Sequence, residues 1–426
     1  LRGPQRHSER WSPPLSTPLA TAQKHSGNWR GPVLGPNLQM KKEETDTLAL
    51  YIHWPFCLSR CPYCDFNAHV REMVDQDRWR SALMTELTYW ARETPGRTLT
   101  SIFFGGGTPS LMGPTTAAAL INCAAKNWSF ASDIEITLEA NPTSIEAGKF
   151  RELRTAGVNR VSIGVQALEN DVLKFLGRNH DRKLAIKAIK LAAKTFPRFS
   201  FDLIYARPKQ SIEAWSKELQ EAIDLAEGHL SLYQLTIEKG TPFYVDQRAG
   251  TLTSPDEENA AALFETTQEV CEHNSLPAYE ISNHARPGSE CRHNLTYWTG
   301  GEYIGIGPGA HGRLVINGSC YATEQIPGPE NWLTTTEAHG HATRHKKVLT
   351  PHNRLEEILM MGLRLTDGLS RADFLLRTGL ELEDALDPRR LRPILAANYL
   401  VLDNRGLRTT TEGRLRLNPI LGALLG

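Results

Sequence analysis

The sequence has no excess of charge of either sign and no long apolar run. Its 48 Lys and Arg residues balance 48 Asp and Glu residues, so no basic face is predicted and nucleic acid is not an expected partner. No apolar stretch approaches the ~20 residues that cross a bilayer as a helix, so no transmembrane segment is predicted. The seven cysteines have no paired spacing, which suits a reducing compartment.

The first residues differ in composition from the rest. Residues 1–39 hold five Lys or Arg, one acidic residue and six prolines, and they begin with Leu rather than Met. We expect residues 1–46 to be disordered or to be a non-native extension, with Met40 as the initiator. A transit peptide is the alternative, because the segment is basic and poor in acidic residues.

Strand-like and helix-like segments alternate from residue 47 to about residue 240. Such alternation is typical of right-handed crossovers and a parallel sheet. Six units predict an α/β fold of the partial (β/α)6 barrel type, with a doubly wound sheet as the competing topology. The predicted strands are 49–54, 99–104, 134–140, 160–165, 200–205 and 229–236. The predicted helices are 77–92, 115–127, 145–156, 182–194 and 212–226.

This alternation stops in the remaining sequence. Residues 241–349 contain a predicted helix at 255–274, then glycines and histidines that we expect on loops covering the open mouth of the barrel. Residues 350–426 are predicted to form a small helical domain. Its helices at 354–365, 371–378 and 389–398 precede a hairpin at 400–410, an arrangement like a winged helix.

Three cysteines, Cys57, Cys61 and Cys64, lie on one short loop with the spacing C-x3-C-x2-C. The loop follows the first predicted strand, which Pro55 ends because proline cannot donate to a sheet ladder. Three thiolates suit an iron–sulfur cube with one iron left open to a small ligand. Zinc with a histidine as fourth ligand is the alternative, and a disulfide is weaker because three is an odd number.

Polar or glycine residues follow several other predicted strands. Residues 105–109 read Gly-Gly-Gly-Thr-Pro, where a ligand could approach the backbone closely and exposed N–H groups could bind a carboxylate; a tight turn is the plain alternative. Glu139, Gln166 and Asp202 come at the ends of the next three strands. Since the carboxyl ends of parallel strands share one edge, this edge is the predicted site.

Together, the cysteine loop, Gly105–Pro109 and the polar strand ends resemble the radical S-adenosylmethionine superfamily. The run Tyr51-Ile-His-Trp-Pro-Phe-Cys57 is characteristic of its HemN/HemW group, and the likeness extends over about nine-tenths of the chain. It implies a [4Fe–4S] cluster on the three cysteines and S-adenosylmethionine on its open iron. The residues that the resemblance assigns to S-adenosylmethionine are Tyr51, Tyr63, Gly106, Gly107, Thr108, Glu139, Gln166, Arg178 and Asp202.

Two features separate the haem-chaperone branch of this group from the oxygen-independent coproporphyrinogen III oxidases. The oxidases have a further cysteine two residues after the triplet, where this chain has Phe66. His293, Asn294, Tyr297 and Trp298 match the H-N-x-x-Y-W sequence of the chaperones. These four residues are the candidates for binding haem b, with His293 as axial ligand and His284 and His311 as further possibilities; a hydrogen-bonded core histidine is the plain alternative.

The resemblance also implies partners and a place in the cell. We expect haem, haem-accepting proteins such as membrane-bound respiratory enzymes, and an electron donor. Coproporphyrinogen dehydrogenase activity is not expected, although an enzymatic role stays open. A cytoplasmic, bacterial location is expected, peripheral to the membrane through its partners, or a mitochondrial one if residues 1–39 are a transit peptide.

Overall fold

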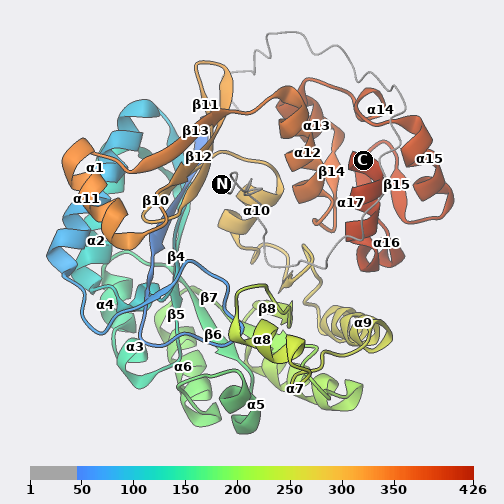
Figure 1. Ribbon diagram of the computed structural model, residues 1–426, viewed down its shortest axis with the longest axis horizontal. Coiled ribbons are helices and arrows are strands. Elements are labelled where there is room, and N and C mark those ends of the chain that lie inside the picture. Colours follow the sequence, from blue (N-terminus) through green and yellow to red (C-terminus); the bar gives the residue numbers. More distant parts are fainter. Residues whose placement is uncertain (1–45) are drawn as a thin grey trace, which may run out of the picture.

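The computed structural model describes residues 46–426, so the expectations for residues 1–39 and for Met40 lie outside the described residues. Six parallel strands form the centre of the molecule (Figure 1) and are adjacent in the order β1-β4-β5-β6-β7-β8. This order follows the chain without a reversal, so the predicted partial barrel is confirmed over the doubly wound sheet. The strands are β1 Thr47–Trp54, β4 Thr98–Gly106, β5 Ser129–Ala140, β6 Arg160–Gln166, β7 Arg198–Tyr205 and β8 His229–Gln234.

Helices cover the outer face of these strands, and the two faces of each strand differ in chemistry. In β1, Leu50, Ile52 and Trp54 are buried in the main core, together with Trp79 and Trp90 of α1. Tyr51 and His53 alternate with them and face the other way. The helices are α1 Gln76–Glu93, α2 Pro114–Asn127, α3 Ser144–Gly148, α4 Phe150–Thr155, α5 Asn170–Phe175, α6 Arg182–Thr195 and α7 Ile212–Leu225. The single helix predicted at 145–156 is therefore two, separated at Lys149.

Residues 241–349 extend the sheet at both edges instead of lying over the mouth as loops. β9 pairs antiparallel with β8, whereas β10 pairs parallel with β1 and continues into β11, β12 and β13. A glycine such as Gly305 resembles a loop residue in the sequence. In the sheet it is required for close approach of the backbone, because a Cβ there would lie 2.0 Å from the carbonyl oxygen of His311. The elements are α8 Pro242–Arg248, α9 Glu257–His273, β9 Asn283–Ala285, α10 Arg292–Trp298, β10 Tyr303–Ile306, β11 His311–Ile316, β12 Ser319–Gln325, α11 Pro329–His339 and β13 Thr343–Val348.

The C-terminal segment has its own core and is helical as predicted. Leu359, Phe374 and Leu407 are buried in a cluster separate from that of the barrel. The predicted hairpin is present as β15 and β16, which β14 extends to three strands. The elements are α12 Pro351–Gly362, β14 Leu369–Ser370, α13 Arg371–Thr378, α14 Leu382–Ala385, α15 Pro388–Ala396, β15 Leu400–Leu402, β16 Gly406–Thr409, α16 Thr411–Leu415 and α17 Leu417–Leu425. Among residues 46–426, no helix is both long and apolar enough to cross a membrane.

Glu86 on α1 joins the outer helix layer to the sheet extension. Its buried carboxylate accepts hydrogen bonds from the backbone N–H groups of Gly307 at 2.8 Å and Ala342 at 2.9 Å, and from the Trp332 indole at 3.0 Å. Burial raises the pKa of Glu86 to about 7, and the three hydrogen bonds oppose that rise. The carboxyl group therefore holds three distant segments together at a cost in desolvation.

We predict that Glu86→Gln lowers the free energy of unfolding by ~1–3 kcal/mol. The glutamine has only one acceptor oxygen, and its NH₂ group would replace the oxygen that accepts from one or more of the three buried N–H donors, leaving them unpaired. The pKa of Glu86 in the folded protein lies above its ordinary value of 4.5. The stability that Glu86 contributes is therefore fully present below pH 4.5 and falls as pH rises through about 7. Urea unfolding over this range should show a deficit that shrinks with rising pH. Exposed Glu72→Gln is the control, and equal stability of both variants would contradict the assignment.

Candidate functional site

The cysteine loop lies where β1 ends, at the carboxyl end of the barrel strands. Cys57, Cys61 and Cys64 are partly buried, and all seven cysteines of the chain are free thiols, against the disulfide alternative. The Thr108 hydroxyl donates to Cys57 Sγ at 3.3 Å, and the Arg178 guanidinium donates to Cys61 Sγ at 3.2 Å. The thiolate is the form of cysteine that binds metal, and these contacts fix the positions of two of the three sulfur atoms.

A cavity of about 520 Å³ opens beside this loop and is called the mouth cavity here. Every residue assigned to the cluster or to S-adenosylmethionine lines it except Tyr51. Tyr51 lies behind the wall, where its hydroxyl is 3.0 Å from His53 Nδ1. The sequence did not single out several further lining residues: Asn141, Glu146, Ser162, His180 and Tyr233. Ser162 and Tyr233 lie within predicted strands, so the inward register of those strands could have identified them. Glu146 lies on α3 and His180 follows α5, where no strand pattern applies.

The glycine segment forms one wall of the mouth cavity and is shaped by close contacts. Gly106 has φ +116°, and a Cβ there would lie 2.6 Å from the His53 ring. A Cβ on Gly107 would lie 2.8 Å from the carbonyl oxygen of Phe56. Only glycine fits either position.

The expectation that this segment exposes N–H groups to a carboxylate is wrong for three of its residues. Gly106 N–H donates to Glu139 at 3.2 Å, Gly107 N–H to the Trp54 carbonyl at 2.8 Å, and Thr108 N–H to the Phe56 carbonyl at 2.8 Å. The chain crosses back over the cysteine loop here, so loop and strand backbones satisfy each other.

Two partly buried carboxyl groups with shifted pKa values, Glu139 and Asp202, also line the mouth cavity. Burial raises the pKa of Glu139 to about 8, with a further contribution from Asp202, while the Gly106 N–H opposes the rise. Burial also raises the pKa of Asp202 to about 6, against hydrogen bonds from Ser231 and Ser162. Carboxyl groups held partly neutral within a cavity are typical of functional sites.

Arg178 connects the cysteine loop to the strand ends. One of its nitrogens contacts Cys61, and another donates to the Gly164 carbonyl at 2.7 Å and to the Asn141 side chain. It reaches 3.4 Å from the Tyr63 hydroxyl as well. Arg178 follows α5 rather than a strand. It reaches the site because residues 177–180, between α5 and α6, line the mouth cavity.

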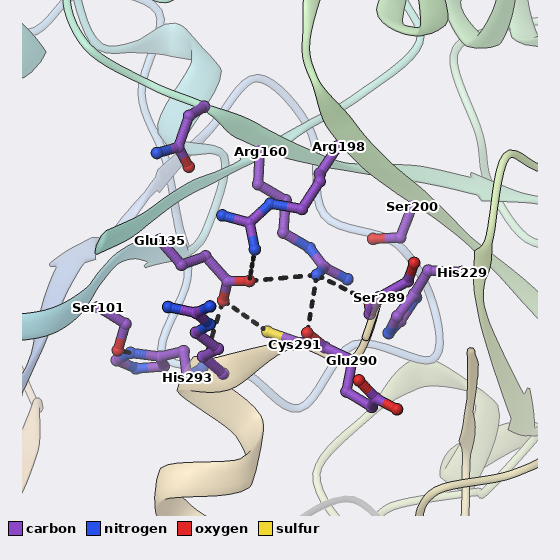
Figure 2. Close-up of polar contacts among 12 residues, drawn as sticks. Ser101, Glu135, Arg160, Arg198, Ser200, His229, Ser289, Glu290, Cys291 and His293 are labelled. Carbon is purple, nitrogen blue, oxygen red and sulfur yellow. Dashed lines mark hydrogen bonds and ion pairs between the residues drawn. The ribbon is translucent and has the colours of Figure 1, made fainter. Parts of the chain in front are cut away.

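The H-N-x-x-Y-W residues lie at the opposite end of the barrel. They form α10, which lies on the inner side of the curved sheet (Figure 1). His293 contacts Ser101 of β4 and Glu135 of β5, in the amino-terminal parts of their paired segments. Figure 2 shows Glu135 of β5 between Arg160 and Arg198 on one side and Cys291 and His293 on the other. Glu135 accepts from the Cys291 thiol and from the His293 backbone N–H, both at 3.3 Å.

The geometry of His293 does not offer a ring nitrogen to haem iron. The side chain is 1% exposed, with Nδ1 2.9 Å from the Ser101 hydroxyl and Nε2 2.7 Å from the Tyr297 hydroxyl. Burial lowers the pKa of His293 to about 3, so the ring is neutral. The core-histidine alternative therefore describes His293 in this arrangement, and axial ligation of haem by His293 stays a prediction.

Of the other haem candidates, only those on α10 lie near His293. Asn294 and Trp298 lie on α10 and are partly exposed. His284 is buried on β9, and His311 lies on β11, at the other side of the sheet. These histidines do not gather around His293.

Comparison with known proteins identifies two families along the chain. Residues 51–222 match the Radical SAM superfamily, and residues 349–416 match the HemN C-terminal domain. A zebrafish (Danio rerio) protein named "Radical S-adenosyl methionine domain-containing protein 1, mitochondrial" is 38% identical over 88% of this chain and 86% of its own length. The mouse (Mus musculus) protein of the same name is 40% identical, over 88% of this chain and 87% of its own length.

A bacterial relative and a solved structure extend this likeness. The Escherichia coli "Heme chaperone HemW" is 37% identical over 89% of this chain and 98% of its own length. The solved structure of coproporphyrinogen III oxidase (HemN) from E. coli aligns with a TM-score of 0.75 at 22% identity, over 89% of this chain and 90% of that chain. At that identity the alignment establishes a shared fold.

We predict a strained backbone at Gln166, which has φ +71°. A side chain in this region costs ~1 kcal/mol, and Gly removes the cost. Gln166→Gly should therefore be more stable than Gln166→Ala by ~0.5–1 kcal/mol, although both lose the amide that lines the mouth cavity. Urea unfolding of the two variants measures the difference, and an Ala variant as stable as the Gly variant would show that the strain is absent.

Proposed function

The chain belongs to the radical S-adenosylmethionine superfamily and to its HemN/HemW group, and on that premise we propose that it is a HemW-like haem chaperone. In this role it binds haem b and delivers it to haem proteins, including respiratory enzymes. The observation that carries the proposal is the H-N-x-x-Y-W helix together with Phe66, in a chain 37% identical to "Heme chaperone HemW" of E. coli along 98% of that protein.

The mouth cavity suits a [4Fe–4S] cluster on Cys57, Cys61 and Cys64. A cube takes one thiolate on each of three irons, so its ligands surround a volume rather than a point. Among the described residues, no group of three or more His, Cys, Asp or Glu side chains has the geometry for a single metal ion. Three free thiols on one loop, a guanidinium at Cys61 and a cavity of about 520 Å³ fit the larger group.

The remaining lining residues suit S-adenosylmethionine. The cluster, once bound and reduced, supplies one electron to the sulfonium, which is the chemistry of the cofactor rather than of the protein. The protein contributes a close glycine backbone at Gly106 and Gly107, acidic side chains at Glu139 and Asp202, and polar groups at Thr108, Gln166 and Arg178. Tyr51 and Tyr63 support this wall, with Tyr51 acting through His53.

Phe66 argues against the oxidase role. It replaces the fourth cysteine of the oxidases and is 52% exposed at the rim of the mouth cavity. An apolar side chain there is more consistent with contact to a partner than with chemistry on substrate.

The proposed partners are haem, the haem-accepting proteins and an electron donor. The compartment must be the one that holds the acceptors, and the zebrafish and mouse relatives carry "mitochondrial" in their names.

We predict that the anaerobically reconstituted protein binds iron, sulfide and one haem but does not convert coproporphyrinogen III to protoporphyrinogen IX. Cys61→Ser should lose most cluster iron and keep haem binding, because the mouth cavity and α10 lie at opposite ends of the barrel. Metal analysis, Soret absorption and porphyrin chromatography read these outcomes, with buried Cys271→Ser as the matched control.

Each contrary outcome points to a different function. Conversion of coproporphyrinogen III would identify a dehydrogenase and overturn the chaperone role. One zinc per chain without iron or sulfide would identify a zinc-stabilised binding module. Haem loss in parallel with cluster loss in Cys61→Ser would mean that the two sites are coupled.

A further inference from the structure

A second cavity, of about 150 Å³, lies between the barrel and the C-terminal helical segment, and we call it the seam cavity. It is walled by the end of α10, by β10 and β11, and by α12. Its lining residues are Tyr297, Gly300, Gly301, Tyr303, Arg313, Arg354, Glu357, Met360, Met361 and Arg364. Tyr297 brings the H-N-x-x-Y-W helix into this wall, so the helix has a role that iron ligation by His293 does not explain.

The seam cavity carries an excess of positive charge. Three guanidinium groups and one carboxylate line it. Glu357 is already engaged by two of the arginines, since Arg313 binds it at 2.8–3.0 Å and Arg354 lies 3.6 Å from it. The third arginine, Arg364, is left without a carboxylate within ion-pair distance among the described residues.

Arg364 is 9% exposed. Its guanidinium donates to the Met360 carbonyl and stacks over the Trp298 ring, with its carbon 5.9 Å from the ring centroid. A single carbonyl leaves most of the five N–H donors of an arginine unused. Burial lowers the pKa of Arg364, and the charge of nearby Glu280 opposes this shift only in part. The Glu280 carboxylate accepts from Ser282 and Asn283 instead of binding Arg364. A buried guanidinium without a directly bonded carboxylate is costly, so a cavity that contains one favours an anionic ligand, above all a carboxylate that it can bind through two bonds.

The H-N-x-x-Y-W residues hold this arrangement in place. His293 fixes the Tyr297 hydroxyl at 2.7 Å, and the Tyr297 ring packs edge-on against Tyr303 at 4.5 Å. Trp298 supports Arg364 from the other side. The histidine thus positions a cavity wall, the tyrosine forms the wall, and the tryptophan supports the cation.

The size of the seam cavity limits what enters it. Sites for whole ligands of drug size are ~300–1,000 Å³, so about 150 Å³ admits a side arm and leaves a macrocycle outside. Met360 at the rim is 38% exposed, and methionine adapts to flat apolar surfaces.

We infer that the seam cavity is a carboxylate site that receives a propionate arm of haem, with Arg364 as its principal contact. This inference rests on the proposed haem role for the identity of the ligand. The carboxylate chemistry itself rests on the charges and burial described above.

Ferric haem and its dimethyl ester, titrated anaerobically into the full chain, test this site. The wild type should bind haem about tenfold more tightly than the ester, because the ester lacks the charge that Arg364 binds. Arg364→Gln should lose about tenfold in haem affinity with little change for the ester. Arg364→Lys should keep part of the preference and guards against a folding defect, while exposed Arg392→Gln is the matched control.

Equal binding of haem and ester by the wild type, or an unchanged preference in Arg364→Gln, would overturn the site while leaving the haem role intact. If the wild type binds neither compound, the haem role fails. Thermal unfolding in the presence of propionate, compared with neutral propionamide, then tests whether the seam cavity binds a carboxylate. Stabilisation by propionate alone, lost in Arg364→Gln, supports a carboxylate site; no difference between the two compounds overturns it.

Discussion

The buried ion pair between Glu135 and Arg160 is the interaction on which the end of the barrel opposite the mouth cavity depends. This end, where α10 packs, is called the floor of the barrel. The two side chains are 0% and 2% exposed and lie 3.2 Å apart. Removing one partner of such a pair typically costs ~3–5 kcal/mol, because the other charge stays buried. Glu135 also receives the first residues of α10, and Arg160 donates to the Ser289 and Glu290 carbonyls, as Figure 2 shows.

This floor gives the barrel two ends with different chemistry. The mouth has partly exposed thiols, glycine backbone and carboxyl groups with raised pKa values, and it is open to a ligand. The floor is closed by α10, with its histidine neutral and doubly hydrogen-bonded. An aromatic column connects the two, since His293 stacks on Phe103 at 5.0 Å and Phe103 on Tyr51 at 6.3 Å.

Local patterns predicted the barrel because its strands and helices carry strong periodicity. The cysteine loop, Glu139, Gln166 and Asp202 could be placed at one edge because parallel strands all end there. Arg178 was found through family resemblance, since nothing in its local sequence shows that the chain returns over the mouth. The left-handed backbone of Gln166 has no sequence signal either, because glycine or asparagine is the usual residue in that conformation.

The sheet extension and the seam cavity were beyond sequence reasoning for a different reason. β9 and β10 have three and four residues, too few to show alternation. Gly305 looks like a turn residue, but the sheet requires it for close backbone approach. Nothing in the sequence distinguishes Arg364, and only the packing of α12 against α10 shows that its guanidinium is buried without a carboxylate within ion-pair distance among the described residues.

The end of the sheet at β13 has a consequence for association. Its outer backbone groups could pair with a strand from another molecule, yet Arg344, Lys346 and Lys347 lie along this edge. Positive side chains on an edge strand repel a second copy of the same strand and oppose edge-to-edge aggregation. This charged edge therefore keeps the end of the sheet from adhering to other copies of the chain.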